Sequence, residues 1–368
     1  MANPSKVKTF NIQAAVLRTG SPLKIESLEL EGPNDDEILV RIVASGICHT
    51  DIGFVDGWDG TANPVVLGHE GAGVVEQIGK HVKGVKRGDH VVLSYQSCGR
   101  CRACRRGHPF DCEYFWEANF GFHRLDGSNA LHRSGVRGHF FGQSSFATHA
   151  LATERNLVKV PKSLPLELLA PMGCGLQTGA GTVINSLKVR KGKGIAIFGT
   201  GAVGLAAVMA ARVVGADPII GVDIKPIRLK LARELGATHI IDNRRHDIAS
   251  HITRITGSGI DYVLDTTGDQ EMFEITIRTL NRKGILALLA GNESAGSLSE
   301  GRKVISVIQG DAVPQRFIPN LIRLYQTGRF PFDRLVKFYD FKEINKAMAD
   351  SKEGNTIKPV LRIGSVSN

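Results

Sequence analysis

The segment FGTGAVG, residues 198–204, decides the fold of the second half of the chain. It follows the apolar run GIAIF (194–198) and opens a stretch of helical character, GAVGLAAVMAARVV (201–214). The G-x-G-x-x-G pattern alone is a weak signal, but a strand before it and a helix after it are typical of a dinucleotide-binding unit. A glycine turn that serves packing alone is the alternative. The context favours a parallel sheet that binds a dinucleotide.

The residues of this turn have separate expected roles. Gly199 permits the tight turn, Gly201 lets the backbone approach a pyrophosphate, and Gly204 allows close contact between helix and strand. Ala202 and Val203 begin the helix, whose free N–H groups can bind phosphate.

Asp223 ends the next predicted strand, PIIGVD (218–223), nineteen residues past Gly204. A carboxylate there accepts hydrogen bonds from the adenosine ribose and repels a 2′-phosphate, which favours NAD over NADP. Lys225 and Arg228 follow closely, and their charges leave the strictness of this preference open.

Around this unit, hydrophobic patterning divides the α/β chain into two domains. After about residue 175, apolar strands alternate with helical segments, which predicts a doubly wound parallel sheet covered on both faces. Before it, short β-type runs such as EILVRIVASGIC (37–48) suit a mostly antiparallel, barrel-like domain. A length of 368 residues agrees with two domains. The predicted boundaries are 1–176 with 313–368 for the β-rich domain, and 177–312 for the nucleotide-binding domain.

The cysteines form the second chemical signal. Four of the six lie within fifteen residues, spaced C-x2-C-x2-C-x7-C, at Cys98, Cys101, Cys104 and Cys112. Four thiolates so close can surround one tetrahedral ion, whereas two disulfides would need an oxidising compartment.

Cys48 and Cys174 remain, and with His69 they supply three ligands of the kind that a catalytic zinc site with one open position uses. Lone Cys and His residues are also common core residues, so the residues alone leave this trio open.

Charge and hydropathy limit the partners. The formal net charge is +10, but no RNA-binding aromatic motif accompanies it, so we expect no nucleic-acid partner. Residues 1–20 hold no apolar run typical of a signal peptide, and no window approaches the ~18 apolar residues of a membrane span. We expect a soluble, cytoplasmic protein with reduced cysteines and no membrane partner.

Several motifs together resemble one family. GHEGAGVVEQIG (68–79), the four-cysteine lobe, the position of Cys174 and FGTGAVG resemble the zinc-dependent medium-chain alcohol dehydrogenases, from about residue 12 to residue 364. FFGQSSFATHA (140–150) and GCGLQTGAGTVIN (173–185) resemble the aryl-alcohol (benzyl-alcohol) dehydrogenase branch. The resemblance implies a GroES-like catalytic domain, a Rossmann domain, two Zn²⁺ per chain, NAD, and a homo-oligomer, either a dimer or a tetramer.

Matched position by position, the resemblance also implies residue roles. The trio of Cys48, His69 and Cys174 would hold the catalytic zinc, and the four clustered cysteines would hold a structural zinc in the lobe 97–113. Asp51 would fix the tautomer of His69. Glu70 would lie near the metal, and Thr50 would take the proton of the substrate. The implied cofactor contacts are His49, Thr178, Gly199, Gly201, Ala202, Val203, Gly204, Asp223, Arg228 and Lys358.

The chemistry implied is hydride transfer from a primary alcohol to NAD, giving the aldehyde, with zinc acidifying the alcohol. The chain departs from the family pattern at Gly53, where many members have a histidine that ends the proton path. Water, His49 or another group must then carry the proton. His49 also matches a basic contact to the pyrophosphate, which is the favoured role.

An aromatic substrate is the last expectation. The run YFWEANFGFH (114–123) is rich in rings, and Phe140 and Phe141 match family positions near the substrate. Core packing is the alternative for these rings. Competing functions are a glutathione-dependent formaldehyde dehydrogenase, a polyol dehydrogenase, and a catalytically silent binding or structural relative. Polyol enzymes typically have a carboxylate where Cys174 stands, and silent relatives usually lose zinc ligands, all seven of which are present.

Overall fold

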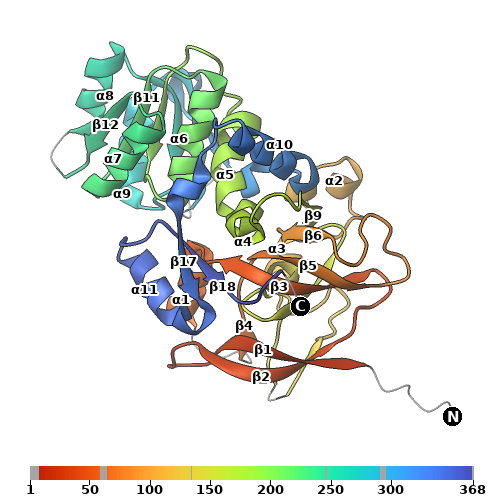
Figure 1. Cartoon of the computed structure of the whole chain (residues 1–368). Helices are drawn as coiled ribbons and strands as arrows, with labels where there is room; N and C mark the ends of the chain where they lie inside the picture. Colours follow the sequence, from red (N-terminus) through yellow and green to blue (C-terminus); the bar gives the residue numbers. More distant parts are fainter. Residues whose placement is uncertain (1–7, 59–63, 134, 245–246, 291–295, 367–368) are drawn as a thin grey trace. The chain divides into compact units, whose positions relative to one another are not determined.

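The computed structural model describes residues 8–58, 64–133, 135–244, 247–290 and 296–366 (Figure 1). Its internal contacts divide the chain into two compact units. Unit 1 consists of Met1–Cys174, Val313–Ile318 and Leu335–Asn368, and unit 2 of Gly175–Ala312 and Pro319–Arg334.

The units differ from the predicted boundaries at two places, one of which is small: residues 175–176 belong to unit 2 instead of the β-rich domain. We predicted that all of 313–368 belongs with the β-rich domain, but Pro319–Arg334 belongs to unit 2. This segment includes most of the amphipathic helix α10 (Pro314–Gln326). An apolar helix face indicates burial, but it does not indicate which core the helix joins.

Unit 1 contains two sheets. One has the strand order β4-β1-β2-β7, and the other has the order β17-β18-β3-β5-β6-β9, with β8 also paired to β3. The strand pairs are antiparallel except for β17 with β18. The strands are β1 (Thr9–Leu17), β2 (Lys24–Glu31), β3 (Glu37–Gly46), β4 (Val65–Val66), β5 (Glu70–Ile78), β6 (His90–Leu93), β7 (Leu131–His132), β8 (His149–Thr153), β9 (Leu157–Lys159), β17 (Val336–Asp340) and β18 (Lys358–Arg362).

Short helices connect these strands. They are α1 (His49–Gly57), α2 (Arg102–Arg105), α3 (Phe115–Phe120), α4 (Leu166–Leu169) and α11 (Ile344–Lys352), with helical turns η1 (Pro109–Asp111), η2 (Phe140–Gly142), η3 (Ala170–Gly173) and η8 (Phe341–Glu343). Within the described residues, no helix has the length and apolar character that crossing a membrane requires.

The central strand β3 sets the register of unit 1. It is rich in β-branched residues and buried on both faces, and Ile38, Val40 and Ile42 pack with Val91 and Leu93 in one core. Its last residue, Gly46, pairs with Glu70 at the start of β5. A Cβ at Gly46 would collide with the Glu70 carboxylate. The residues after β3 and those before β5 therefore lie at the same end of these two strands.

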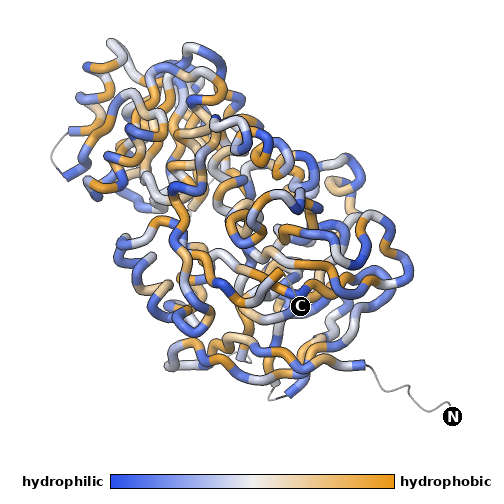
Figure 2. Tube along the Cα trace, in the orientation of Figure 1, coloured by the Kyte–Doolittle hydropathy of each residue, from blue (hydrophilic) through white to orange (hydrophobic). Residues whose placement is uncertain are grey.

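Unit 2 is a seven-stranded sheet of order β12-β11-β10-β13-β14-β16-β15, parallel except for β15 with β16. Apolar residues of its strands, such as Phe198, Val222 and Val263, pack with Ile248 and Ile252 in one core. Figure 2 colours hydrophobic segments of the chain orange. The strands are β10 (Ile195–Phe198), β11 (Ile219–Asp223), β12 (His239–Asp242), β13 (Ile260–Asp265), β14 (Leu280–Leu288), β15 (Gly296–Ser297) and β16 (Lys303–Ser306).

Parallel neighbouring strands need crossover connections, and in unit 2 helices form these connections from β10 to β14. Helices α6 and α7 pack side by side after β10 and β11, and α8 and α9 pack side by side after β12 and β13. Their bounds are α5 (Gly175–Gly181), α6 (Ala202–Val214), α7 (Pro226–Leu235), α8 (Ile248–Thr256) and α9 (Gln270–Thr279), with the turns η4 (Thr182–Ser186), η5 (Ser299–Gly301), η6 (Gln309–Asp311) and η7 (Phe332–Leu335), the last of which ends in unit 1.

Candidate metal centres and nucleotide site

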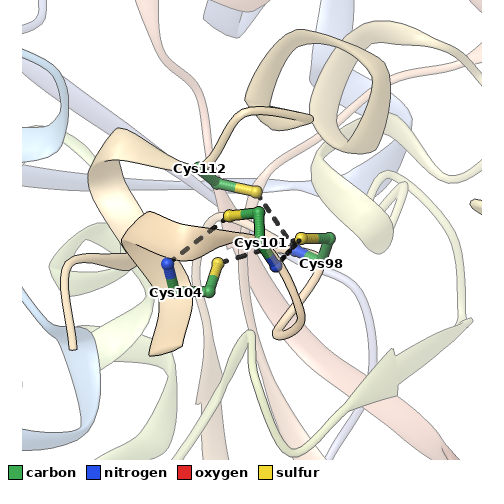
Figure 3. Close-up of side chains that lie close together, drawn as sticks. All are labelled: Cys98, Cys101, Cys104 and Cys112. Carbon is green, nitrogen blue, oxygen red and sulfur yellow. Dashed lines mark hydrogen bonds between the residues drawn. The ribbon is translucent and has the colours of Figure 1, made fainter. Parts of the chain in front are cut away.

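The four clustered cysteines meet in a small lobe of unit 1 (Figure 3). Their sulfurs all lie within 4.8 Å of one another, and all four cysteines are free of disulfide bonds. Backbone N–H groups turn toward the sulfurs: the amides of Cys98, Cys101 and Cys104 donate to Cys112, Cys98 and Cys101 at 3.3, 3.3 and 3.4 Å.

This lobe fits a tetrahedral zinc ion. Zinc–sulfur bonds of about 2.3 Å place two thiolates of a tetrahedron roughly 3.8 Å apart. The sulfurs of Cys98 and Cys104 are 4.0 Å apart. The amide of Cys104 lowers the pKa of the Cys101 thiol to about 6, which favours the thiolate that metals bind. The lobe is therefore a candidate closed, structural zinc site.

A second group of candidate ligands lies at this end of strands β3 and β5 in unit 1. The ligand atoms of Cys48, His69, Glu70 and Cys174 all lie within 4.8 Å of one another. Cys48 is the residue before α1, His69 and Glu70 lie at the start of β5, and Cys174 follows η3. The structure thus brings together the three predicted ligands and adds a carboxylate to them.

His69 supports metal binding at this group. Its ring is fully buried, and Nδ1 lies 3.1 Å from Asp51 Oδ1. Its Nε2 is buried and has no hydrogen-bond partner in the described part of the chain. Asp51 also accepts N–H groups from Cys48 at 2.9 Å and Gly68 at 3.1 Å, so its orientation is fixed. An oriented imidazole with a free nitrogen beside two thiols is the donor set that zinc uses.

Glu70 carries a buried ion pair with Lys358. The Lys358 ammonium donates to both Glu70 carboxylate oxygens, at 2.9 and 3.0 Å, and to the Ile47 carbonyl at 3.0 Å. Burial raises the pKa of Glu70, and the Lys358 charge opposes that shift. Burial alone would lower the pKa of Lys358, but Glu70 and Cys48 raise it.

Thr50 and His49 start helix α1 beside the metal ligands. The Thr50 hydroxyl lies 3.8 Å from Cys48 Sγ and is partly exposed, and His49 is exposed. This position beside a candidate metal ligand agrees with the predicted role of Thr50, which is to accept the proton of an alcohol bound at the metal.

The glycine-rich turn of unit 2 has the predicted form. Gly199 follows β10 with φ of 82°, and Gly201 precedes the first residue of α6. A Cβ at Gly204 would collide with the Gly199 carbonyl, so the close approach of helix and strand requires glycine there. A Cβ at Gly179 in α5 would collide with the carbonyl of Val203, which places the neighbouring Thr178 near the start of α6.

Hydrogen bonds hold Asp223 at the C-terminal end of β11, the same end of the parallel sheet as the glycine-rich turn. Its Oδ2 accepts the Thr200 N–H at 2.7 Å and the Thr200 hydroxyl at 3.0 Å, and its Oδ1 accepts the Lys225 N–H at 2.8 Å. Arg228 Nη1 lies 4.0 Å away, and the buried Nε of Arg228 lacks a partner within the described residues. This acid at a strand end beside a glycine-rich helix start suits a dinucleotide ribose.

Known proteins share this arrangement. Residues 34–162 match the family model "Alcohol dehydrogenase GroES-like domain", and residues 202–323 match "Zinc-binding dehydrogenase". The geraniol dehydrogenase of Castellaniella defragrans is 46% identical over 365 residues, which cover 96% of this chain and 98% of that protein. This identity over nearly the whole length decides the family. The chain belongs to the zinc-containing medium-chain alcohol dehydrogenases.

Solved structures of the family agree. A benzyl alcohol dehydrogenase from Acinetobacter calcoaceticus is 44% identical and superposes with a TM-score of 0.92, covering 96% of this chain and 99% of that one. An alcohol dehydrogenase zinc-binding domain protein from Burkholderia ambifaria is 49% identical, with a TM-score of 0.92 and coverage of 97% and 100%. The predicted GroES-like and Rossmann fold class and the zinc-dependent alcohol dehydrogenase activity are confirmed.

Three predicted residues of this alcohol dehydrogenase, Lys358, Phe140 and Phe141, have surroundings in this structure that differ from those expected for their roles. Lys358 was expected to contact the cofactor phosphates, but its three N–H donors point at Glu70 and Ile47. Phe140 was expected to stack on the substrate, but it is 0% exposed, and Phe141 is 3% exposed. A ring without accessible surface cannot form the wall against a substrate in this conformation.

Phe140 and Phe141 instead pack behind the metal ligands. Phe141 stacks on the His69 ring at 4.4 Å between centroids, and Phe140 meets the same ring edge-on at 5.5 Å. Phe54 and Phe120 contact these rings and have partly accessible surface. The sequence carried a signal for Phe54, which stands four residues after Thr50 on a helix.

Proposed function

We propose that this alcohol dehydrogenase oxidises primary alcohols with an aromatic or similarly flat, unsaturated apolar part. The balanced reaction converts the alcohol and NAD⁺ into the aldehyde, NADH and one proton. The observation that carries the proposal is a stripe of side chains on helix α1 that begins at Thr50 and continues with rings.

The stripe consists of Thr50, Phe54 and Trp58. Residues four apart lie on one face of a helix, and Trp58 caps the end of α1. Thr50 is next to Cys48 Sγ, so the face starts at the candidate metal ligands and runs away from them. The apolar part of an alcohol whose oxygen lies near Thr50 meets Phe54 next.

Other rings hold Phe54 in place. It stacks on Phe120 at 5.8 Å with an interplanar angle of 11°, meets Phe140 edge-on at 5.1 Å, and lies 6.4 Å from Trp58. Offset and edge-on pairs of this kind add about 0.5–1.5 kcal/mol each to a packed ring. A rigid aromatic surface favours flat substrates, and the geraniol and benzyl alcohol named for the relatives are both unsaturated next to the carbinol carbon.

The chain's own residues divide the remaining work. Zinc, when bound, supplies a Lewis acid that acidifies the alcohol. Asp51 holds His69 in the tautomer whose Nε2 faces the ligand group, and Thr50 accepts the substrate proton. The Lys358 ammonium neutralises the buried Glu70 carboxylate next to the candidate zinc ligands. Gly199 to Gly204 and Asp223 bind the NAD pyrophosphate and ribose.

Initial rates of NADH formation, followed by absorbance at 340 nm, test the substrate class. We expect wild-type kcat/KM for benzyl or cinnamyl alcohol to exceed that for ethanol at least tenfold, because each methylene equivalent buried contributes about 0.8 kcal/mol. Phe54→Ala should reduce this ratio about tenfold, since it removes the ring that the substrate would contact.

Val55→Ala is the matched control, because Val55 is the next residue of α1 and lies outside the stripe. It should leave the ratio within about twofold, in line with the loss of one small side chain. Equal constants for ethanol and benzyl alcohol in the wild type would contradict the aromatic substrate. A strong preference for hydroxymethylglutathione would establish the formaldehyde dehydrogenase alternative instead.

A further inference from the structure

A buried glutamine, Gln143, lies at the centre of a hydrogen-bond network next to the second metal group. This group consists of Cys48, His69, Glu70 and Cys174. We propose that Gln143 is a positioning residue, which fixes the backbone that carries His69 and Glu70 and, through Ser94, the backbone that carries Cys174. The proposal rests on the proposed function only in requiring that this group holds zinc.

The Gln143 amide connects two segments of the sheet. Its Oε1 accepts the Gly71 N–H at 3.1 Å, and its Nε2 donates to the carbonyls of His69 and Ser94, both at 3.0 Å. Gln143 is 3% exposed, so these bonds are shielded from water. Two of its three partners flank Glu70, and one belongs to the ligand His69 itself.

Ser94 extends the network to the third ligand segment. The Ser94 hydroxyl donates to the Gly173 carbonyl at 2.6 Å, and Gly173 precedes Cys174. The two segments are tightly packed, because a Cβ at Gly173 would collide with the Leu93 carbonyl. Moving Gln143 would therefore disturb the positions of His69 and Cys174 together.

The loop that carries Gln143 is itself held in a costly conformation. His139, Phe141 and Ser144 have φ of 63°, 53° and 54°, a left-handed region that is unfavourable for each residue with a Cβ. Ser144 Oγ accepts the Phe140 N–H at 2.9 Å and donates to the Val66 carbonyl at 2.6 Å. Such strain persists where the surroundings determine it, and it is common next to functional sites.

A second anchor joins this loop to the strand that leads to Cys48. The hydroxyls of Ser145 and Ser45 are 2.8 Å apart and fully buried. Ser45 lies near the end of β3, three residues before Cys48. The loop thus contacts the segments that carry His69 and Cys48 directly, and it is linked to the segment that carries Cys174 through Ser94.

Zinc release to a chromogenic chelator tests this role without relying on turnover. The release phase that is missing in Cys174→Ser reports the second metal group. Gln143→Leu should accelerate that phase at least tenfold, because a mispositioned ligand set holds the ion less well. Gln143→Glu keeps the acceptor and loses the donors, so it should give a smaller acceleration and serves if the leucine variant folds poorly.

Asn119→Leu is the matched control. Asn119 is also a fully buried amide with three backbone partners, the Gln96 N–H and the carbonyls of Gln96 and Phe115, at 2.7 to 3.0 Å. Its loss should cost similar stability and spare the phase that Cys174→Ser removes. Equal acceleration of that phase by both leucine variants, or none by Gln143→Leu, would overturn the positioning role.

The outcome separates this role from the proposed function. Gln143-dependent zinc release in a protein that oxidises no aromatic alcohol would contradict the proposed function and leave the positioning role standing. A wild type with no zinc release that depends on Cys174 would overturn the positioning role, whatever its activity.

Discussion

Lys358 and Glu70 form an ion pair whose side chains are 3% and 0% exposed. Removing one partner of a buried pair typically costs about 3–5 kcal/mol, because the other charge stays buried without compensation. Lys358→Met should therefore lower the free energy of unfolding by several kcal/mol, as measured by urea denaturation with zinc present.

The double variant Lys358→Met with Glu70→Gln is the control, since it removes both charges and should recover part of the stability. Had Lys358 served mainly the cofactor phosphates, its replacement would raise KM for NAD and leave unfolding unchanged. That result would restore the role predicted from sequence.

We propose that Asp223 determines the choice between NAD and NADP. Asp223→Gly should weaken the binding of NAD and lower the ratio of kcat/KM for NAD over kcat/KM for NADP at least tenfold. The reason is that the substitution removes both a hydrogen-bond acceptor for the ribose and a charge that repels a 2′-phosphate. Asp223→Asn is the useful comparison, since it keeps an acceptor for Thr200 and loses only the charge. An unchanged ratio in both variants would assign the preference to Lys225 and Arg228.

At the scale of elements, the cysteine lobe is a loop that has little other structure to hold it. Between Cys98 and Cys112 the chain forms only the short α2 and η1. A structural zinc contributes folding energy directly, so Cys101→Ser should lower the melting temperature more than Cys174→Ser does. Cys174→Ser should have the larger effect on kcat. Identical effects of the two variants on melting temperature and kcat would contradict the division into structural and catalytic sites.

The elements also show which features a sequence can predict. Strand and helix periodicity indicated the main strands of both units, and the glycine turn and Asp223 lie at one end of the parallel sheet, as predicted for a dinucleotide site. Hydrophobic periodicity shows which side chains are buried, but it does not show which buried ring faces a substrate. For that reason Phe140 was expected at the substrate, whereas Phe54 carries the accessible surface.

Contacts between residues distant in sequence account for what was missed. Lys358 pairs with Glu70 across 288 residues, and Gln143 binds the His69 carbonyl across 74. No local spacing connects such positions, because the pairing of β18, β3 and β5 creates the proximity. The ligand set could be matched to a family pattern, whereas the residues that hold it depend on the folded sheet.

In the whole molecule, the proposed mechanism requires two metal ions with different roles, one in the closed lobe and one next to Thr50. Elemental analysis of the purified protein tests this most directly, with Cys174→Ser measured in parallel. We predict two zinc ions per chain in the wild type and one in the variant. One zinc per chain in both, after preparation in zinc-supplemented medium, would contradict the catalytic zinc site and with it the proposed mechanism.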